Sequence, residues 1–273
     1  VATIPVLVKL TPNVADIRYV ARAAVKGGAD GLSLINTINS IMGVNLDTFE
    51  ISPNVDGKSS HGGYCGPAVK PIALHMLSQL AMDPEVNVPI SGIGGIATWQ
   101  DAAEFIALGA SSTQVCTAAM HYGFRMVEDL IDGLTHYLET RGCANLSEIR
   151  GKALPRVTDW GHLNLNYRVV ARIDAAKCIQ CNLCHIACED GAHQCIRPVQ
   201  PGVREFPVVD ETSCVGCNLC SLVCPVDQCI TMTRLDDPAA AAETWSQRVA
   251  RTGSTLAAWQ ASGTHHAGST TGE

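Results

Sequence analysis

Cysteine dominates the chemistry that this sequence could perform. Of the 273 residues, 13 are cysteines, and ten of them lie between Cys178 and Cys229. Eight of the ten form two runs with the same spacing, in which three cysteines are separated by two residues each and a fourth follows after three more. The first run is Cys178, Cys181, Cys184 and Cys188, and the second, 36 residues further on, is Cys214, Cys217, Cys220 and Cys224. The two runs form an internal repeat.

This spacing is typical of ferredoxin-type domains that bind two 4Fe–4S clusters. Three closely spaced cysteines surround one cubane, and the fourth cysteine of the run ligates the other cluster. The spacing therefore predicts one cluster on Cys178, Cys181, Cys184 and Cys224, and the other on Cys214, Cys217, Cys220 and Cys188. Zinc is the alternative, but zinc sites use pairs of Cys-x2-Cys about 15–20 residues apart and need no third and fourth cysteine in each run.

Two further cysteines lie beside the runs. Cys195 and Cys229 occupy matching Gln-Cys-Ile contexts. A cysteine that is not a ligand behaves as a small hydrophobic residue and is usually buried. We therefore expect both to be buried and neither to be a ligand.

Composition excludes several classes of partner. The formal net charge is −7, and the sequence has no run of Lys or Arg, which argues against binding to nucleic acid or to an anionic membrane surface. No apolar stretch approaches the ~18 residues that a membrane span requires. Clustered cysteines without an export signal favour metal binding in a reducing compartment, so we expect a cytoplasmic protein.

The first half of the sequence alternates predicted strands and helices. Strands are expected at 4–8, 31–35, 88–91 and 113–116, and helices at 14–26, 67–82, 98–108 and 124–140, whereas 36–66 holds few regular signals. Such alternation predicts βαβ units and a parallel sheet. A (β/α)8 barrel has eight units in about 250 residues. Four units therefore leave two architectures open: a small doubly wound domain, or the second half of a barrel.

The remaining sequence divides by composition. We expect a domain at 1–142, a connector at 143–168 and the ferredoxin-type domain at 169–236. The tail, 237–273, is rich in Ala, Ser, Thr and Gly and is predicted to be partly disordered. The sequence also starts at Val1, without Met and inside a predicted strand, so we expect further sequence upstream.

Polar and glycine residues follow the ends of the predicted strands, where ligands bind in parallel α/β folds. They are Lys9 after the first strand, Asn36 and Thr37 after the second, Ser91-Gly92-Ile93-Gly94-Gly95 at the third, and Cys116-Thr117 at the fourth. Glycines between a strand and a helix let backbone N–H groups approach a phosphate. The pattern favours a ligand that contains a phosphate group.

Three segments of the sequence resemble the FMN-binding dihydroorotate dehydrogenase superfamily. They are Val8-Lys9-Leu10-Thr11-Pro12-Asn13, Gly62-Gly63-Tyr64-Cys65-Gly66-Pro67-Ala68 and Ser91-Gly92-Ile93-Gly94-Gly95-Ile96. Together with a C-terminal two-cluster module, the combination resembles the dihydropyrimidine dehydrogenases, in particular the catalytic subunit of the bacterial NAD-dependent enzymes. The resemblance extends over residues 1 to about 250.

The resemblance implies roles for individual residues. Lys9 would lie near the flavin ring, and Asn36 and Thr37 would hydrogen-bond the pyrimidine. The residues implied to contact FMN through the backbone or its phosphate are Gly66, Ile93, Gly94, Gly95, Cys116 and Thr117. The proton-transferring cysteine of the family lies upstream of Val1, so no catalytic residue is expected in this chain, and Cys65 is not assigned that role.

The implied protein is an oxidoreductase of pyrimidine catabolism, built from the C-terminal half of a (β/α)8 barrel and a ferredoxin domain. It would interconvert uracil or thymine and their 5,6-dihydro forms. Electrons would pass between FMN and a partner subunit that holds FAD and NAD(H), through the two clusters, in a hetero-oligomer. The chain alone is expected to be inactive. Two alternatives stay open: a dihydroorotate dehydrogenase with a fused ferredoxin domain, and an electron carrier whose α/β part is only a scaffold.

Overall fold

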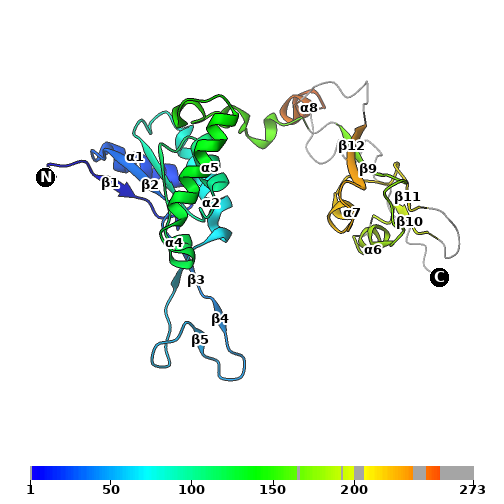
Figure 1. Cartoon of the computed structure of the whole chain (residues 1–273), viewed down its shortest axis with the longest axis horizontal. Helices are drawn as coiled ribbons and strands as arrows, with labels where there is room; N and C mark the ends of the chain where they lie inside the picture. Colours follow the sequence, from blue (N-terminus) through cyan, green and yellow to red (C-terminus); the bar gives the residue numbers. More distant parts are fainter. Residues whose placement is uncertain (1, 165–166, 192, 200–205, 236–243, 253–273) are drawn as a thin grey trace. The chain divides into compact units, whose positions relative to one another are not determined.

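The computed structural model describes the chain except for residues 1, 165–166, 192, 200–205, 236–243 and 253–273 (Figure 1). Contacts divide the chain into two compact units, Val1–Val157 and Thr158–Glu273. No helix in the described residues is both long enough and apolar enough to cross a membrane.

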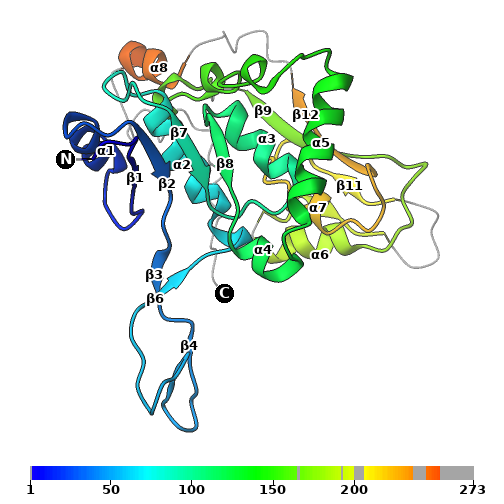
Figure 2. The same cartoon turned by 60° about the vertical axis from the view of Figure 1, so that its left-hand side comes forward.

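The first unit is built on a four-stranded parallel sheet (Figure 2). Its strands are β1 (Leu7–Lys9), β2 (Gly31–Leu34), β7 (Ile90–Ile93) and β8 (Ser112–Gln114), in the order β1-β2-β7-β8. Along the chain, each new strand of this sheet is added beside the strand that came before it. Right-handed crossovers therefore place all the connecting helices on one face of the sheet. A doubly wound sheet reverses its order at a switch point, and this sheet does not. The topology is that of consecutive units of a (β/α)8 barrel.

The predicted helices are present, with one addition. They are α1 (Ile17–Lys26), α2 (Lys70–Ala81) after a 3-10 turn at Pro67–Val69, α3 (Trp99–Ala107) and α5 (Met126–Thr140), and the short α4 (Thr117–Tyr122) precedes α5. Asp16 caps the start of α1 by accepting a hydrogen bond from the backbone N–H of Arg18 at 2.9 Å. Two 3-10 turns, Leu146–Glu148 and Leu154–Arg156, complete the unit.

The core of the first unit is aliphatic and aromatic. Leu32 and Leu34 of β2 are fully buried, as are Leu77 of α2 and Phe105 of α3. Gly92 of β7 makes room for the aromatic ring, because a Cβ at this position would lie 2.4 Å from the Phe105 side chain. Burial of such side chains stabilises a fold by about 1.5–3 kcal/mol each.

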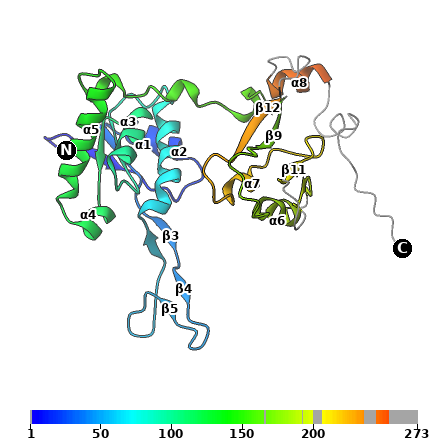
Figure 3. The same cartoon turned by 45° about the vertical axis from the view of Figure 1, so that its right-hand side comes forward.

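An antiparallel arm occupies the segment where the sequence holds few regular signals. At its base β3 (Ile38–Ser40) pairs with β6 (Gly62–Tyr64), and further out β4 (Gly43–Val44) pairs with β5 (Ile51–Ser52). Figure 3 shows the arm projecting away from the sheet and helices of its unit. The pairing brings the chain back from β2 to α2, so that residues 36–37 and 64–66 lie side by side.

The second unit is small and rich in cysteine. Strand β9 (Arg168–Ile173) pairs antiparallel with β12 (Ile230–Leu235), and β10 (Ile196–Arg197) pairs antiparallel with β11 (Val208–Val209). The helices are α6 (Leu183–Asp190), α7 (Leu219–Leu222) and α8 (Trp245–Thr252), and a 3-10 turn covers Trp160–His162. The predicted disorder of 237–273 concerns mostly residues outside the described part, and α8 is the described section of that tail.

Candidate functional site

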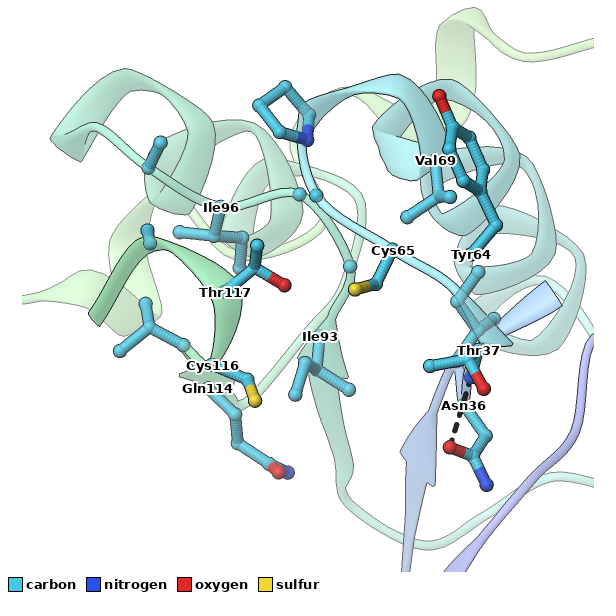
Figure 4. A pocket seen from close by; sticks show the side chains of 18 of the residues that line it. Asn36, Thr37, Tyr64, Cys65, Val69, Ile93, Ile96, Gln114, Cys116 and Thr117 are labelled. Atoms are coloured by element: carbon cyan, nitrogen blue, oxygen red, sulfur yellow. Dashed lines mark hydrogen bonds between the residues drawn. The ribbon is translucent and has the colours of Figure 1, made fainter. Parts of the chain in front are cut away.

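The ends of the parallel strands surround a cavity of about 170 Å³ (Figure 4). All nine residues that the sequence placed at a flavin or pyrimidine site line it: Lys9, Asn36, Thr37, Gly66, Ile93, Gly94, Gly95, Cys116 and Thr117. The arm adds Tyr64 and Cys65, which lie in the same cavity. Residues from all four strand ends therefore meet at one place.

A glycine loop after β7 forms one wall of the cavity. Gly94 and Gly95 have positive φ angles of 139° and 76°, a region of backbone conformation that favours glycine. A Cβ on Gly95 would lie 2.8 Å from the carbonyl oxygen of Gly66. In the described part of the chain, the backbone N–H groups of Gly94, Gly95 and Thr117 donate no hydrogen bond. Three residues that line the cavity thus have backbone N–H groups without an acceptor. Two of the three are glycines, which have no side chain to cover the N–H group.

A carboxylate fixes the far end of this loop. Asp101 of α3 accepts hydrogen bonds from the backbone N–H groups of Ala97 at 2.9 Å and Thr98 at 2.8 Å, and it pairs with the Lys70 ammonium at 2.5 Å. Burial alone would raise the pKa of Asp101, but the hydrogen bond from Lys70 and those from the loop outweigh it and lower that pKa. The charged carboxylate therefore joins the start of α3 to the start of α2.

A polar row crosses the sheet under the cavity. Lys9, Ser33, Ser91 and Ser112 are register partners on the four strands, so their side chains leave the same face. The side-chain amide of Gln114 donates to Ser33 Oγ at 2.9 Å and to Ser91 Oγ at 2.8 Å, and Ser112 Oγ lies 2.8 Å from Ser91 Oγ. Sequence reasoning did not identify this network. Its signal was a serine at the centre of the otherwise apolar strand β2.

Lys9 carries the positive charge of the cavity. It lines the cavity at the end of β1, and no group among the described residues forms an ion pair or hydrogen bond with its ammonium. A cation in this position is available to a bound anion or to a carbonyl oxygen of a ligand.

The loop after β2 presents an amide to the cavity. Asn36 Oδ1 accepts a hydrogen bond from the Thr37 backbone N–H at 2.9 Å, which leaves the two N–H groups of Asn36 Nδ2 as donors (Figure 4). Asn13, in the loop after β1, holds this segment from the other side. Its Nδ2 donates to the Thr37 carbonyl at 3.0 Å, and its Oδ1 accepts from the Asn39 N–H at 2.9 Å. Asn13 therefore positions Thr37 although it does not line the cavity.

The eight repeat cysteines of the second unit surround two cavities of about 20 Å³ each. One is lined by Cys178, Cys181, Cys184 and Cys224, and the other by Cys188, Cys214, Cys217 and Cys220. Each cavity gathers three cysteines of one run and the fourth cysteine of the other. These are the two ligand sets expected from the spacing.

The four repeat cysteines around each cavity match the number of cysteines that ligate a 4Fe–4S cluster. No group of three or more His, Cys, Asp or Glu in the described residues is placed to hold one metal ion. Thiolates are the ligands that iron–sulfur clusters use, and the backbone N–H of Gln180 approaches Cys178 Sγ at 3.4 Å, as a donor to a ligated sulfur would.

Comparison with known proteins covers both units. The dihydroorotate dehydrogenase family matches residues 1–138, and the 4Fe-4S dicluster domain matches residues 171–232. The cysteine repeat therefore lies within a dicluster domain.

Curated relatives match at high identity. The chain is 49% identical over 194 residues to the NAD-dependent dihydropyrimidine dehydrogenase subunit PreA of Escherichia coli K12, which covers 71% of this chain and 47% of the relative. It is 46% identical over 150 residues to the catalytic subunit of dihydroorotate dehydrogenase B (NAD(+)) of Pyrococcus abyssi, covering 55% and 48% of the two chains. It is 42% identical over 161 residues to the chloroplastic dihydropyrimidine dehydrogenase (NADP(+)) of Arabidopsis thaliana, covering 58% and 38%.

The chain spans about half the length of the first two of these relatives. The family match covers half of the chain, and the residues that resembled the family in sequence line one cavity at the ends of its parallel strands. The chain belongs to the dihydroorotate dehydrogenase family.

Proposed function

We propose that this chain is part of an FMN-dependent, iron–sulfur oxidoreductase that interconverts uracil or thymine and the corresponding 5,6-dihydropyrimidine. The observation that carries the proposal is the meeting of three kinds of group in one cavity. A free cation, Lys9, a row of unused backbone donors and the Asn36 amide all face the same space. A dicluster domain in the same chain supplies a route for single electrons.

The cavity fits FMN in its chemistry. The N–H groups of Gly94, Gly95 and Thr117 would hold the phosphate, with Ile93, Cys116 and Gly66 beside it, because a dianion satisfies donors that no protein group uses. Lys9 would lie near the ring, where a cation favours the reduced and anionic form of a flavin. FMN, when bound, accepts an electron pair from a substrate and releases the electrons singly.

Asn36 and Thr37 suit a pyrimidine. A uracil or dihydrouracil ring offers carbonyl acceptors next to N–H donors, and the free Nδ2 of Asn36 can donate to such a carbonyl. The Thr37 hydroxyl can both donate and accept. Because Asn13 fixes the backbone at Thr37, the two side chains would meet the ring in one orientation.

The extent of the relatives' matches favours dihydropyrimidines over dihydroorotate. The match to the Escherichia coli dihydropyrimidine dehydrogenase subunit covers 194 residues, more than the first unit contains, so it extends into the second unit. The match to the Pyrococcus abyssi dihydroorotate dehydrogenase subunit covers 150 residues, fewer than the first unit contains. The dihydropyrimidine dehydrogenase subunit therefore resembles part of both units, which supports the dihydropyrimidine proposal.

The clusters would be held by the two crossed ligand sets, which the two cavities support. Single electrons that reach the clusters would pass from them to a partner subunit. The partner proposed here is a subunit that binds FAD and NAD(H), in a cytoplasmic hetero-oligomer. A relative named as a subunit of an NAD-dependent enzyme supports this arrangement.

The test is anaerobic photometry on the protein expressed from the start codon of its own gene. Purified protein should contain FMN, and dihydrouracil or dihydrothymine should bleach its flavin absorbance, while dihydroorotate should not. Asn36→Ala should leave the FMN content unchanged and raise the dihydropyrimidine concentration needed for half bleaching by tenfold or more. The reason is that the substitution removes a hydrogen bond between uncharged groups and leaves the substrate carbonyl without a donor.

Two outcomes would favour the alternatives. Bleaching by dihydroorotate alone would make the protein a dihydroorotate dehydrogenase with a fused cluster domain. A protein with full cluster content and no affinity for FMN would be an electron carrier.

A further inference from the structure

We propose that the Cys195 thiol is a hydrogen-bond donor to the cluster ligated by Cys188 and Cys214, and that it raises the reduction potential of this cluster relative to its twin. The inference rests on the cluster ligands proposed above. It gives a role to a cysteine that lies outside both ligand runs.

Cys195 lies inside one of the two cluster cavities. It is only 5% exposed and lines the cavity together with four predicted ligands, Cys188 and Cys214 among them. Its Sγ is 3.5 Å from Cys188 Sγ, and the Cys214 side chain lines the same cavity. Both neighbours belong to the same predicted ligand set. Since four other cysteines already line this cavity, Cys195 is not needed as a ligand.

A neutral thiol beside two ligated thiolates has one polar hydrogen to donate. Among the described residues, Cys188 Sγ lies within hydrogen-bond distance of Cys195 Sγ, and no carbonyl oxygen accepts the hydrogen of Cys195. Hydrogen bonds to the sulfurs of a cluster are one of the factors that set its potential. Reduction adds one electron to the cluster and no proton, so the donor stabilises the reduced form more than the oxidised form.

The repeat provides a matched comparison in Cys229. This residue is 2% exposed, lines the other cavity and contacts two ligands of that set, Cys178 and Cys224. However, its Sγ also donates to the backbone carbonyl of Asp174 at 3.8 Å. The hydrogen of Cys229 is therefore shared with a backbone acceptor, whereas that of Cys195 is available to the cluster alone. The two clusters, equal in ligand number and spacing, differ in this donor.

The experiment is an EPR-monitored redox titration of the full 273-residue chain, reconstituted anaerobically with iron and sulfide. Cys195→Ala should lower the equilibrium constant for one-electron reduction of one cluster by about three- to tenfold. A tenfold decrease corresponds to a reduction potential lower by ~59 mV. Cys195→Ser keeps a donor and should remain within about twofold of the unsubstituted chain. Cys229→Ala, the matched control, should change either cluster by less than about twofold.

A ligand variant identifies which cluster responds. Cys217 is an exposed ligand of the set that Cys195 contacts. In a Cys217→Ala chain, Cys195→Ala should have no effect on the potential of the cluster that remains. A shift of that remaining cluster would overturn the inference.

Three other results separate this inference from the proposal beneath it. Unchanged potentials in Cys195→Ala, with about eight iron per chain, would overturn the inference and leave the dicluster site standing. Loss of a cluster in both Cys195→Ala and Cys195→Ser would overturn it as well, because Cys195 would then be a ligand. Failure of the unsubstituted chain to take up iron would instead refute the cluster assignment.

Discussion

The hydrophobic cores of the two units consist of different types of residue. The first has a core of aliphatic and aromatic side chains, such as Phe105 and Leu77, that needs no ligand. In the second, the buried core cluster of the described residues holds six cysteines and four aliphatic residues, Val170, Ala171, Ile196 and Ile230, and Pro207 is buried as well. Aliphatic burial is therefore a smaller part of this core than of the first. We therefore expect the first unit to fold without a ligand and the second unit to depend on its clusters for folding.

The strongest way to break this comparison is to remove iron. Anaerobic chelation should unfold the second unit and leave the first intact, because binding free energy is folding free energy where a core is made of ligands. Amide hydrogen exchange should show protection lost in β9 and β12 and retained in β2 and β7. Protection that survives in both units would show that the cysteine core is stable without its clusters.

The next largest effect tests how the two runs share ligands. Cys188→Ala removes a buried thiol that lines the cavity of Cys214, Cys217 and Cys220. The cluster held by those cysteines should be lost or lowered in occupancy, and iron should fall from about eight toward about four per chain. Damage confined to the cluster beside Cys178 would contradict the crossed assignment. Cys143→Ala, which changes a cysteine of the first unit, is the control and should keep all the iron.

A smaller effect is expected at the glycine loop of the first unit. Gly95→Ala places a Cβ where φ is +76° and where the Gly66 oxygen lies 2.8 Å away. The free energy of unfolding should fall by about 1–3 kcal/mol, and FMN affinity should fall at least tenfold. Gly43→Ala, in the arm with no atom within 4 Å of the new Cβ, is the matched control for both measurements. Equal FMN affinity in the two variants would show that the loop does not hold the phosphate.

The smallest effect concerns Asp101 and should depend on pH. Its folded-state pKa is lowered, so the charged carboxylate stabilises the fold at pH values above its unfolded pKa of about 3.9. This contribution disappears as pH falls through the folded-state value. Asp101→Asn should therefore lower the free energy of unfolding by about 1–2 kcal/mol at pH 7, with the difference from the unsubstituted chain shrinking below about pH 4. If the difference in free energy of unfolding between the two chains stays constant down to pH 2, the charge of Asp101 is not its cause.

Features that depend on local spacing were predictable from the sequence. The cysteine runs, the four strands of the sheet and the glycines after β7 each occupy a short stretch whose pattern has a direct geometric meaning. Counting units left a doubly wound domain and half a barrel equally open. Strand order decided between them, and order is a property of the fold that no local pattern contains.

Features that depend on neighbouring strands were not predictable. Gln114 reaches Ser33, 81 residues away, only because β2, β7 and β8 lie in succession. The arm was missed because its strands are two or three residues long, too short to show alternation. Asn13 belonged to a motif that was recognised, but its contact with Thr37 depends on how two loops pack. In each case the missing information was tertiary.

The mixed composition of the two cluster cavities has a consequence for the timing of synthesis. Cys178, Cys181 and Cys184 emerge from the ribosome together, but their cavity is completed by Cys224, 40 residues after Cys184. At about 5–20 residues per second, the nascent chain spends roughly 2–8 seconds with three ligands and no fourth. Neither half of the repeat can close a cavity by itself. The complete set of four cysteines around this cavity therefore exists only after Cys224 has been synthesised.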